Sequence, residues 1–189
     1  TVCSGYYKKP EINANSFIDG WFRTGDAGKL VDGKHLYMTD RLKDLFKTSN
    51  GKYIAPQQIE TILGGDVFIE QVAVIGNNRN FVTAIIAPNL EAIKGYAAQN
   101  NITYELVDEL MEHPQICKMM EERIANLQKD MAPYEKIKKF RMIKRGFTIE
   151  SGELTSTLKR RRAVILQNYA AMIEEMYNPV QGPLGGYAK

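Results

Sequence analysis

Two nearly continuous apolar runs lie near the middle of the chain. Gln71 to Ile75 and Phe81 to Ala87 are rich in β-branched residues, and the polar segment Gly76 to Asn80 separates them. A strand with one wet face alternates between apolar and polar residues, whereas a continuous apolar run is typical of a strand covered on both faces. The pattern therefore predicts a buried antiparallel pair of strands.

Helical patterns flank these strands. Pro56 can begin a helix because its missing N–H lies among the groups that a helix start leaves unpaired, and Gly64-Gly65 would end this helix. A second helix is expected from Leu90 to Gln99. A third is expected after Thr103, whose hydroxyl would accept a hydrogen bond from a first-turn N–H. Pro114 would break this third helix.

Apolar residues then recur every three or four positions in two later segments, which is the spacing of one buried helical stripe. The first segment follows Pro114, and the second, expected as a single amphipathic helix, ends before Pro179. Between them, a short extended run contains Phe140, Met142 and Ile143. The stripes consist of Ile116, Met120, Ile124, Leu127 and Met131 in the first segment and of Ile165, Tyr169, Met172, Ile173 and Met176 in the second.

The beginning of the chain shows no such regularity. Residues Thr1 to Gly28 are rich in aromatic residues, glycine and proline, which indicates loops and short strands packed against something else. Farther along, Asp32-Gly33 and Asn50-Gly51 suit the positive φ angles of tight turns. We expect a small hairpin around each, the second within Leu42 to Ile54.

Composition limits the class of protein. The chain has 189 residues, 44% hydrophobic and 25% charged, as is ordinary for a soluble globular protein. No apolar run reaches the roughly 20 residues of a membrane-spanning helix, and the N-terminus lacks a secretory pattern. Cys3 and Cys117 lie far apart with no CxxC pair. We expect a reduced cytoplasmic protein with no metal site and no transmembrane segment, and peripheral membrane association stays open.

The net charge of +3 is small, but basic residues concentrate in two late groups. They could meet phosphates, or they could form a solvated face whose long side chains cover apolar neighbours. A nucleic-acid-binding module is an alternative that only this charge supports, because no nucleic-acid-binding motif accompanies it. The groups are Lys136, Lys138, Lys139, Arg141, Lys144 and Arg145, and then Lys159 to Arg162.

Three separated blocks are more informative than the charge. Gly5 to Glu11 (GYYKKPE) precedes Gly20 to Asp26 (GWFRTGD), and Tyr37 to Asp44 (YMTDRLKD) follows. In order and spacing these blocks resemble signatures of the adenylate-forming superfamily, which includes acyl-CoA synthetases, luciferases and nonribosomal adenylation domains. Agreement among three blocks is more specific than one short motif.

The resemblance assigns roles to residues in these blocks. Asp26 and Arg41 would bind ATP or AMP, since a carboxylate can accept hydrogen bonds from two ribose hydroxyls and a guanidinium suits the ribose or phosphate side of the same nucleotide. Lys43 would be the hinge about which the C-terminal domain rotates. Without the resemblance, Asp26 would merely close a loop and Arg41 would make a surface ion pair.

Two later segments extend the resemblance. Thr48 to Glu60 (TSNGKYIAPQQIE) resembles the next signature, with one extra residue before the glycine, and implies that Gly51 lies against the pantetheine of CoA. Gly152 to Arg161 (GELTSTLKRR) resembles the catalytic loop of long-chain fatty acid–CoA ligases, which makes Lys159 the expected catalytic residue. Its ammonium would bridge the substrate carboxylate and the α-phosphate and offset their charge.

This catalytic loop departs from the superfamily pattern at two positions. The superfamily usually has a glycine directly before the lysine and a proline earlier in the loop, whereas this chain has Leu158 and Ser156. The assignment of Lys159 therefore depends on the remaining residues of the loop.

The resemblance implies an α+β fold in three parts. Residues 40–178 would form the small mobile C-terminal lid domain, with a β-hairpin and a short central sheet flanked by helices. Residues 1–39 would be a β-rich remnant of the large N-terminal AMP-binding domain, and residues 179–189 a disordered or vector-derived tail. The lid would pack on its own N-terminal domain.

The implied activity is that of an AMP-forming ligase that activates a fatty acid, expected to be long-chain, as acyl-AMP and transfers it to CoA. The family's Ser/Thr/Gly-rich phosphate loop and acidic Mg²⁺ motif do not occur in this sequence. ATP and Mg²⁺ would therefore be bound mainly by the N-terminal domain, and we expect the chain alone to be inactive. An adenylation domain that loads a carrier protein is the alternative.

Overall fold

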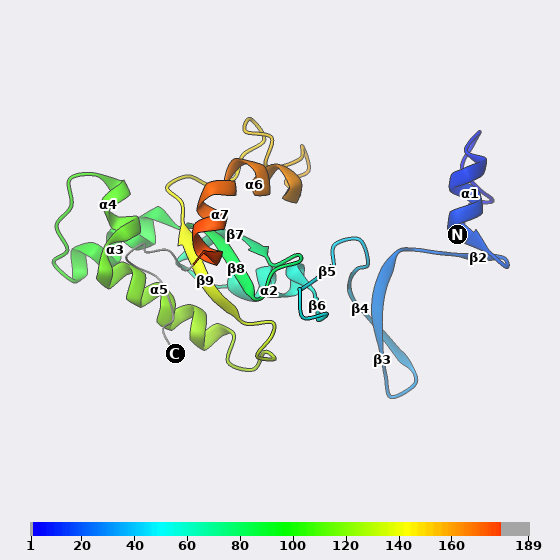
Figure 1. Cartoon of the computed structure of the whole chain (residues 1–189), viewed down its shortest axis with the longest axis horizontal. Coiled ribbons are helices and arrows are strands. Elements are labelled where there is room, and N and C mark those ends of the chain that lie inside the picture. The colour runs from blue at the N-terminus through cyan, green and yellow to red at the C-terminus, as the bar shows by residue number, and fades with distance from the viewer. Residues whose placement is uncertain (1, 179–189) are drawn as a thin grey trace. The chain divides into compact units, whose positions relative to one another are not determined.

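The structure is a computed structural model that describes residues 2–178, apart from the side chains of Thr39 and Asp40 (Figure 1). The expected tail at 179–189, with Pro179, lies outside the described residues. The chain divides into two compact units, Thr1–Leu45 and Phe46–Lys189.

A three-stranded sheet forms the centre of the second unit. The strands β7 (Ile69–Ile75) and β8 (Val82–Pro88) pair antiparallel, which confirms the prediction from the two apolar runs. On its other edge β8 pairs in parallel with β9 (Ile137–Met142), the extended run expected around Phe140. A parallel pair needs a long crossover, and the helices between β8 and β9 supply it.

Helices cover both faces of this sheet, and Figure 1 shows α3 and α5 on one side with α6 and α7 on the other. Val72 and Val74 of β7 point into one apolar cluster, whereas Ala73 and Ile75 point into the second. Since successive strand residues face opposite sides, two covered faces require an apolar residue at nearly every position. The helices on the first side are α2 (Pro56–Leu63), α3 (Leu90–Gln99), α4 (Val107–Glu112) and α5 (Pro114–Leu127), and those on the second are α6 (Arg162–Asn168) and α7 (Ala170–Tyr177).

Two helices have the predicted bounds. The helix α2 runs from Pro56 to the residue before Gly64, and α3 occupies the predicted range. The Asn89 side chain caps α3 by accepting hydrogen bonds from the backbone N–H groups of Glu91 and Ala92. Pro114 separates α4 from α5 as expected, and α5 ends four residues before the last member of its stripe, Met131.

The prediction that Thr103 caps the third helix is wrong. The helix α4 begins at Val107, and its N-cap Leu106 makes no side-chain capping bond. Instead, the Glu109 carboxylate reaches back and accepts a hydrogen bond from the backbone N–H of Glu105 at 3.0 Å. This bond pairs an N–H that precedes the helix, and it does not cap the first-turn N–H groups as the threonine hydroxyl was expected to do. The carboxylates of Asp108 and Glu109 in the first turn complement the helix dipole.

The prediction of one final amphipathic helix is also wrong, because α6 and α7 are separated at Tyr169. The backbone of Tyr169 has φ −108° and ψ 20°, outside the helical region, and its ring packs edge-on against Phe147. Ile173 and Met176 are nevertheless buried with Ile165. The spacing of apolar residues therefore predicted correctly that these residues are buried, although it did not predict that the helix is interrupted.

Short hairpins dominate the rest of the chain, as predicted. The strands β3 (Asp26–Val31) and β4 (His35–Arg41) turn at Asp32 and Gly33, both with positive φ. In the second unit, the two-residue strands β5 (Phe46–Lys47) and β6 (Tyr53–Ile54) turn through Gly51 at φ +80°. The first unit also contains the helix α1 (Pro10–Ser16), which was not predicted, and the strands β1 (Phe17–Ile18) and β2 (Trp21–Phe22).

The two cysteines are free thiols in the described structure. Cys3 is exposed and Cys117 is half-buried. Burial, together with smaller charge effects, raises the pKa of the Cys117 thiol, so it stays protonated more readily than an exposed cysteine.

Candidate functional site

Asp26 and Arg41 lie opposite each other where β3 and β4 begin and end. They are direct cross-strand partners, and Arg41 Nε lies 3.3 Å from Asp26 Oδ1. The Thr24 hydroxyl accepts a hydrogen bond from the Asp26 backbone N–H at 3.1 Å. The Asp26 side chain is 28% exposed and that of Arg41 is 68% exposed. The hairpin therefore brings together the two residues expected to bind a nucleotide.

This pair has the chemistry that a ribose diol requires. A carboxylate offers several acceptor positions for two neighbouring hydroxyls, and the adjacent guanidinium supplies donors and balances the charge. The 3.3 Å contact is long for a charge-assisted hydrogen bond, so Arg41 orients the Asp26 carboxylate through its charge as much as through a hydrogen bond.

Lys43 follows in a turn at the end of this hairpin. The carbonyl oxygen of Arg41 accepts hydrogen bonds from the backbone N–H groups of Asp44 and Leu45. The division between the two units comes directly after Leu45, two residues beyond Lys43. Lys43 is exposed, and its position next to the division suits a residue that absorbs a backbone change.

Gly51 lies in a turn that is tied to the loop between β7 and β8. Its N–H donates to the carbonyl oxygen of Thr48 at 2.9 Å, and the Ser49 N–H donates to that of Arg79 at 3.0 Å. A side chain at Gly51 would meet only Lys47, at 3.7 Å, so packing leaves space here. The backbone needs glycine because φ is +80°, and the open space suits the approach of a ligand chain.

Lys159 lies in a tight turn of the loop before α6, and its residue is exposed. The Thr155 N–H donates to the Lys159 carbonyl oxygen at 2.8 Å, and the Lys159 N–H donates to the Thr155 hydroxyl at 3.1 Å. Leu158 completes the turn with φ +59°. This is the position where the superfamily usually has glycine, and Leu158 adopts the left-handed conformation that favours glycine.

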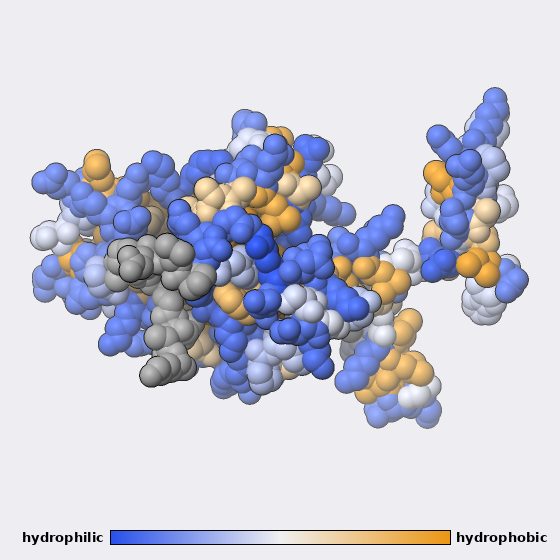
Figure 2. Space-filling model, in the orientation of Figure 1, coloured by the Kyte–Doolittle hydropathy of each residue, from blue (hydrophilic) through white to orange (hydrophobic). Residues whose placement is uncertain are grey.

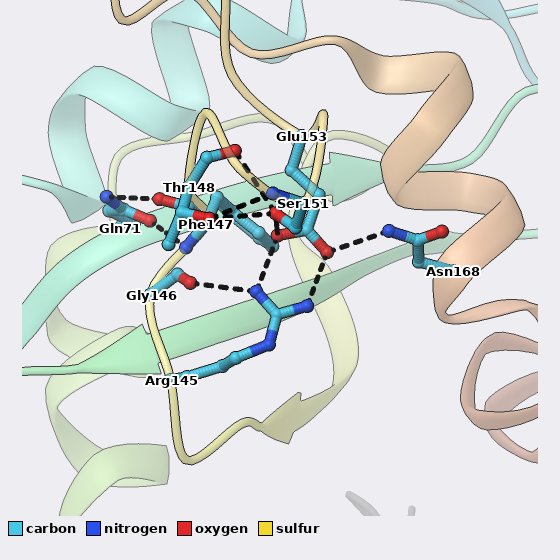
Figure 3. Close-up of polar contacts among 8 residues, drawn as sticks. All are labelled: Gln71, Arg145, Gly146, Phe147, Thr148, Ser151, Glu153 and Asn168. Atoms are coloured by element: carbon cyan, nitrogen blue, oxygen red, sulfur yellow. Dashed lines mark hydrogen bonds and ion pairs between the residues drawn. The ribbon is translucent and has the colours of Figure 1, made fainter.

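Glu153 anchors the segment before this turn (Figure 3). Its side chain is fully buried. Arg145 donates to both carboxylate oxygens, at 2.8 and 2.9 Å, and the Ser151 hydroxyl and the Asn168 amide donate at 2.6 and 3.0 Å. Burial alone would raise the pKa of the Glu153 carboxyl, but these hydrogen bonds and the Arg145 charge outweigh it and lower the pKa to about 2.

The same segment is attached to the sheet through Gln71 of β7. The Gln71 amide oxygen accepts a hydrogen bond from the Phe147 N–H, and its amide nitrogen donates to the Phe147 carbonyl oxygen, as Figure 3 shows. Nearby, the Tyr169 hydroxyl is buried and has no hydrogen-bond partner among residues 2–178. Burial, and then the negative charge of Glu153, raise the pKa of Tyr169.

Glu60 anchors the segment after the turn. This α2 carboxylate is buried and lies 3.0 Å from Arg160 and 2.8 Å from Arg162, measured between carboxylate oxygens and guanidinium nitrogens. It also accepts a hydrogen bond from the Val74 N–H at 2.9 Å. The lysine turn is therefore held between two buried carboxylates, one on each side.

Sequence reasoning did not single out these two carboxylates. The available signal was the position of Glu60 on α2, next to the buried Ile59 and three residues before the buried Leu63. The basic groups left two readings open, phosphate contact or a solvated face. The structure shows a third role for several of them, because Arg145, Arg160 and Arg162 pair with buried carboxylates and Lys144 pairs with Asp108.

Residues 2–178 contain no group of three His, Cys, Asp or Glu side chains that could hold a metal ion. None of the helices in this range is long and apolar enough to cross a membrane.

Similarity to solved structures defines the class of protein. The adenylation domain of a carboxylate reductase from Mycobacterium chelonae matches with a TM-score of 0.73 and 28% identity, covering 92% of this chain and 26% of that one. The corresponding domain from Segniliparus rugosus, solved with AMP and a co-purified carboxylic acid, matches with a TM-score of 0.69 and 28% identity, covering 93% and 26%. The fold is that of the adenylate-forming superfamily.

The family within this class follows from the sequence. The model of the AMP-binding enzyme C-terminal domain matches residues 43–181, and the chain belongs to this family. The long-chain-fatty-acid–CoA ligase FadD15 of Mycobacterium tuberculosis is 33% identical, over 94% of this chain and 30% of that protein. Long chain acyl-CoA synthetase 1 of Arabidopsis thaliana is 34% identical, over 92% and 27%. The chain thus spans less than a third of the length of these curated relatives.

Proposed function

We propose that the chain is the C-terminal part of an AMP-forming acyl-CoA synthetase that activates a long-chain fatty acid and transfers it to CoA. The observation that carries this proposal is the lysine turn, in which Lys159 is presented to solvent between two buried anchors. The names of relatives that are 33% and 34% identical support the same substrate class.

The first unit would belong to the larger AMP-binding domain. None of its described side chains is buried, and Trp21 is 80% exposed. Hydrophobic colour covers part of the surface of β3 and β4 in Figure 2, where Leu30, Leu36 and Met38 are exposed. A segment with so much exposed apolar surface and no core of its own is typical of a piece that packs against further chain.

In the first half-reaction, an oxygen of the fatty acid carboxylate attacks the α-phosphorus of ATP and pyrophosphate leaves. Asp26 would accept hydrogen bonds from the ribose hydroxyls, with Arg41 beside it. The Lys159 ammonium would lie between the carboxylate and the α-phosphate, and would lower the repulsion between the two anions as they approach. Bound Mg²⁺ would neutralise phosphate charge, and we assign its ligands to the domain outside this chain.

In the second half-reaction, the thiol of CoA loses its proton to water and attacks the acyl carbon, and AMP leaves as the bond between the acyl carbon and the phosphate oxygen breaks. A rotation about Lys43 would withdraw Lys159 and bring the Gly51 turn to the thiol's path, where the open space beside Gly51 would accommodate the pantetheine. One nucleotide site would then serve two reactions in turn.

An adenylation domain that loads a carrier protein is the second candidate. The structural similarity to the adenylation domains of carboxylate reductases supports it. The two candidates differ in the thiol that accepts the acyl group. The test compares the rate of acyl transfer by the full-length enzyme to each thiol. Faster transfer to free CoA favours the synthetase, and faster transfer to a carrier-bound phosphopantetheine favours the alternative.

The role of Lys159 is tested by measuring the two half-reactions separately in the full-length enzyme. We expect Lys159→Ala to lower acyl-AMP formation by at least about 100-fold, because a charge aimed at the reacting phosphate is lost. Thioester formation from supplied acyl-AMP should stay within about threefold of the unchanged enzyme, since Lys159 is withdrawn in that step.

Lys138→Ala is the matched control, since it removes another exposed lysine from the same unit, on β9. It should leave both half-reactions unchanged. Equal losses in both steps for Lys159→Ala would remove Lys159 from its proposed role.

A further inference from the structure

Glu60 connects α2, the sheet and the lysine turn. We propose that Glu60 is a positioning residue, which holds the Lys159 turn in the orientation that the adenylation step requires. This inference rests on the proposed function of Lys159. Glu60 itself is buried beneath the turn and would not touch the substrate.

The contacts of Glu60 use both carboxylate oxygens. Oε1 accepts hydrogen bonds from the Val74 N–H at 2.9 Å and from Arg162 at 2.8 Å, and Oε2 pairs with Arg160 at 3.0 Å. Arg162 also donates to the Val74 carbonyl oxygen. Arg160 from the loop and Arg162 from the start of α6 therefore converge on a single carboxylate that is fixed to the backbone of the central sheet.

These contacts control the turn because Arg160 directly follows Lys159. Arg160 pairs with Leu154 across the turn in an isolated antiparallel bridge, and the Arg161 N–H donates to the Glu153 carbonyl oxygen at 2.7 Å. Holding Arg160 thus holds the returning strand of the turn. The Lys159 side chain, in contrast, has a long flexible stem, so its reach depends on where the backbone of the turn is placed.

A buried carboxylate with two arginines is sensitive to loss of its charge. Replacing Glu60 by glutamine keeps the size and an oxygen that can accept from Val74, but leaves Arg160 and Arg162 without their anionic partner. Buried or half-buried guanidinium groups without a partner move toward water. The turn should then sample orientations in which Lys159 no longer reaches the α-phosphate.

The kinetic test uses Glu60→Gln in the full-length enzyme. We expect the kcat of acyl-AMP formation to fall roughly 10- to 100-fold, because a catalytic group displaced by about 1 Å loses activity on this scale. The KM for ATP should change by less than about twofold, and thioester formation from supplied acyl-AMP should be retained, since neither depends on Lys159.

Asp66→Asn is the matched control. The Asp66 carboxylate is also nearly buried, also accepts a backbone N–H, from Phe68, and also pairs with an arginine, Arg123 of α5. None of these partners belongs to the lysine turn. This variant should lower stability to a similar degree and leave the ratio of the two half-reactions unchanged.

A second measurement needs no activity. In the 189-residue chain, the Thr155 and Leu158 N–H groups are hydrogen-bonded within the turn, and Glu60→Gln should raise their hydrogen exchange by at least about tenfold. If Glu60→Gln fails to fold, Arg160→Gln is the second variant for this measurement, because Arg162 still pairs with the Glu60 carboxylate. Arg160→Gln should raise the exchange of the same amides, but by less. Asp66→Asn should leave these amides protected.

The outcomes separate the two proposals. Loss of adenylation in Lys159→Ala without a selective loss in Glu60→Gln would overturn the positioning role alone. An unchanged rate in Lys159→Ala would overturn the proposed function, and with it the catalytic meaning of the Glu60 contacts. Selective loss in both variants, together with faster exchange in the turn, is the expected result.

Discussion

At the scale of single residues, Leu158 is the clearest case of a side chain in an unfavourable backbone conformation. Its φ of +59° costs an L-residue roughly 1–2 kcal/mol. The residue is 69% exposed, so little burial offsets this cost. The turn before Lys159 is retained although the sequence lacks the glycine that would form it most easily.

Leu158→Gly should therefore stabilise the chain. The relief of backbone strain exceeds the entropy cost of a glycine, and we expect a gain of about 0.5–1 kcal/mol in the free energy of unfolding, measured with urea. Ile62→Gly, at a half-exposed position within α2, should have the opposite sign. A loss of stability in Leu158→Gly would show that the Leu158 side chain makes a stabilising contact that outweighs the strain.

A site residue could be predicted from the sequence when its partner is set by local structure, and not when its partner is set by tertiary packing. Asp26 and Arg41 could be identified from a motif because they are separated by a hairpin whose turn residues are visible in the sequence. Glu60 and Glu153 could not be assigned partners, because their arginines come from segments whose positions depend on tertiary packing. Their burial depends on how α2, β7 and the loop before α6 pack together.

At the scale of elements, the continuous apolar strands and the proline or glycine boundaries were predicted well, since each is a local signal. Two local signals gave wrong predictions, namely the capping residue Thr103 and the apolar stripe of the last helical segment. The helix α4 begins at Val107, four residues after Thr103, and its first-turn Glu109 carboxylate accepts from the Glu105 N–H instead. At Tyr169, a regular apolar stripe continued through a break that no proline or glycine marks.

The loop from Arg145 to Glu153 is the element whose stability should depend most on pH. The pKa of Glu153 is lowered to about 2, below the value of roughly 4.3 in an unfolded chain. A lowered folded-state pKa means that the stabilisation is fully present above the unfolded value and is lost as pH falls toward 2. The shift corresponds to at most about 3 kcal/mol.

We expect the free energy of unfolding to decrease between pH 5 and pH 2.5 by more in the unchanged chain than in Glu153→Gln, which has no charge to lose. Denaturant unfolding followed by circular dichroism at several pH values measures both curves. The difference between them isolates Glu153 from the other carboxylates. Parallel curves would contradict the assignment of the low pKa to this residue.

At the scale of the whole molecule, the two units differ in how they are stabilised. Every buried hydrophobic side chain among residues 2–178 belongs to the second unit, from Phe46 onward. The two apolar clusters on the faces of the sheet also lie entirely within it. The proposed site residues are divided between the units, with Asp26, Arg41 and Lys43 in the first and Gly51 and Lys159 in the second.

This distribution predicts that a chain beginning at Phe46 keeps the stability of the whole chain. Because burial of apolar surface is the main stabilising contribution and no described side chain of the first unit is fully buried, its removal should shift the thermal midpoint by less than about 3 °C, or under roughly 1 kcal/mol. Removing residues 170–189 instead deletes α7 with the buried Ile173 and Met176 and should abolish cooperative unfolding. A fall of more than about 8 °C on removing the first unit would mean that it contributes to the core, and would argue against a lid that folds by itself and moves as one body.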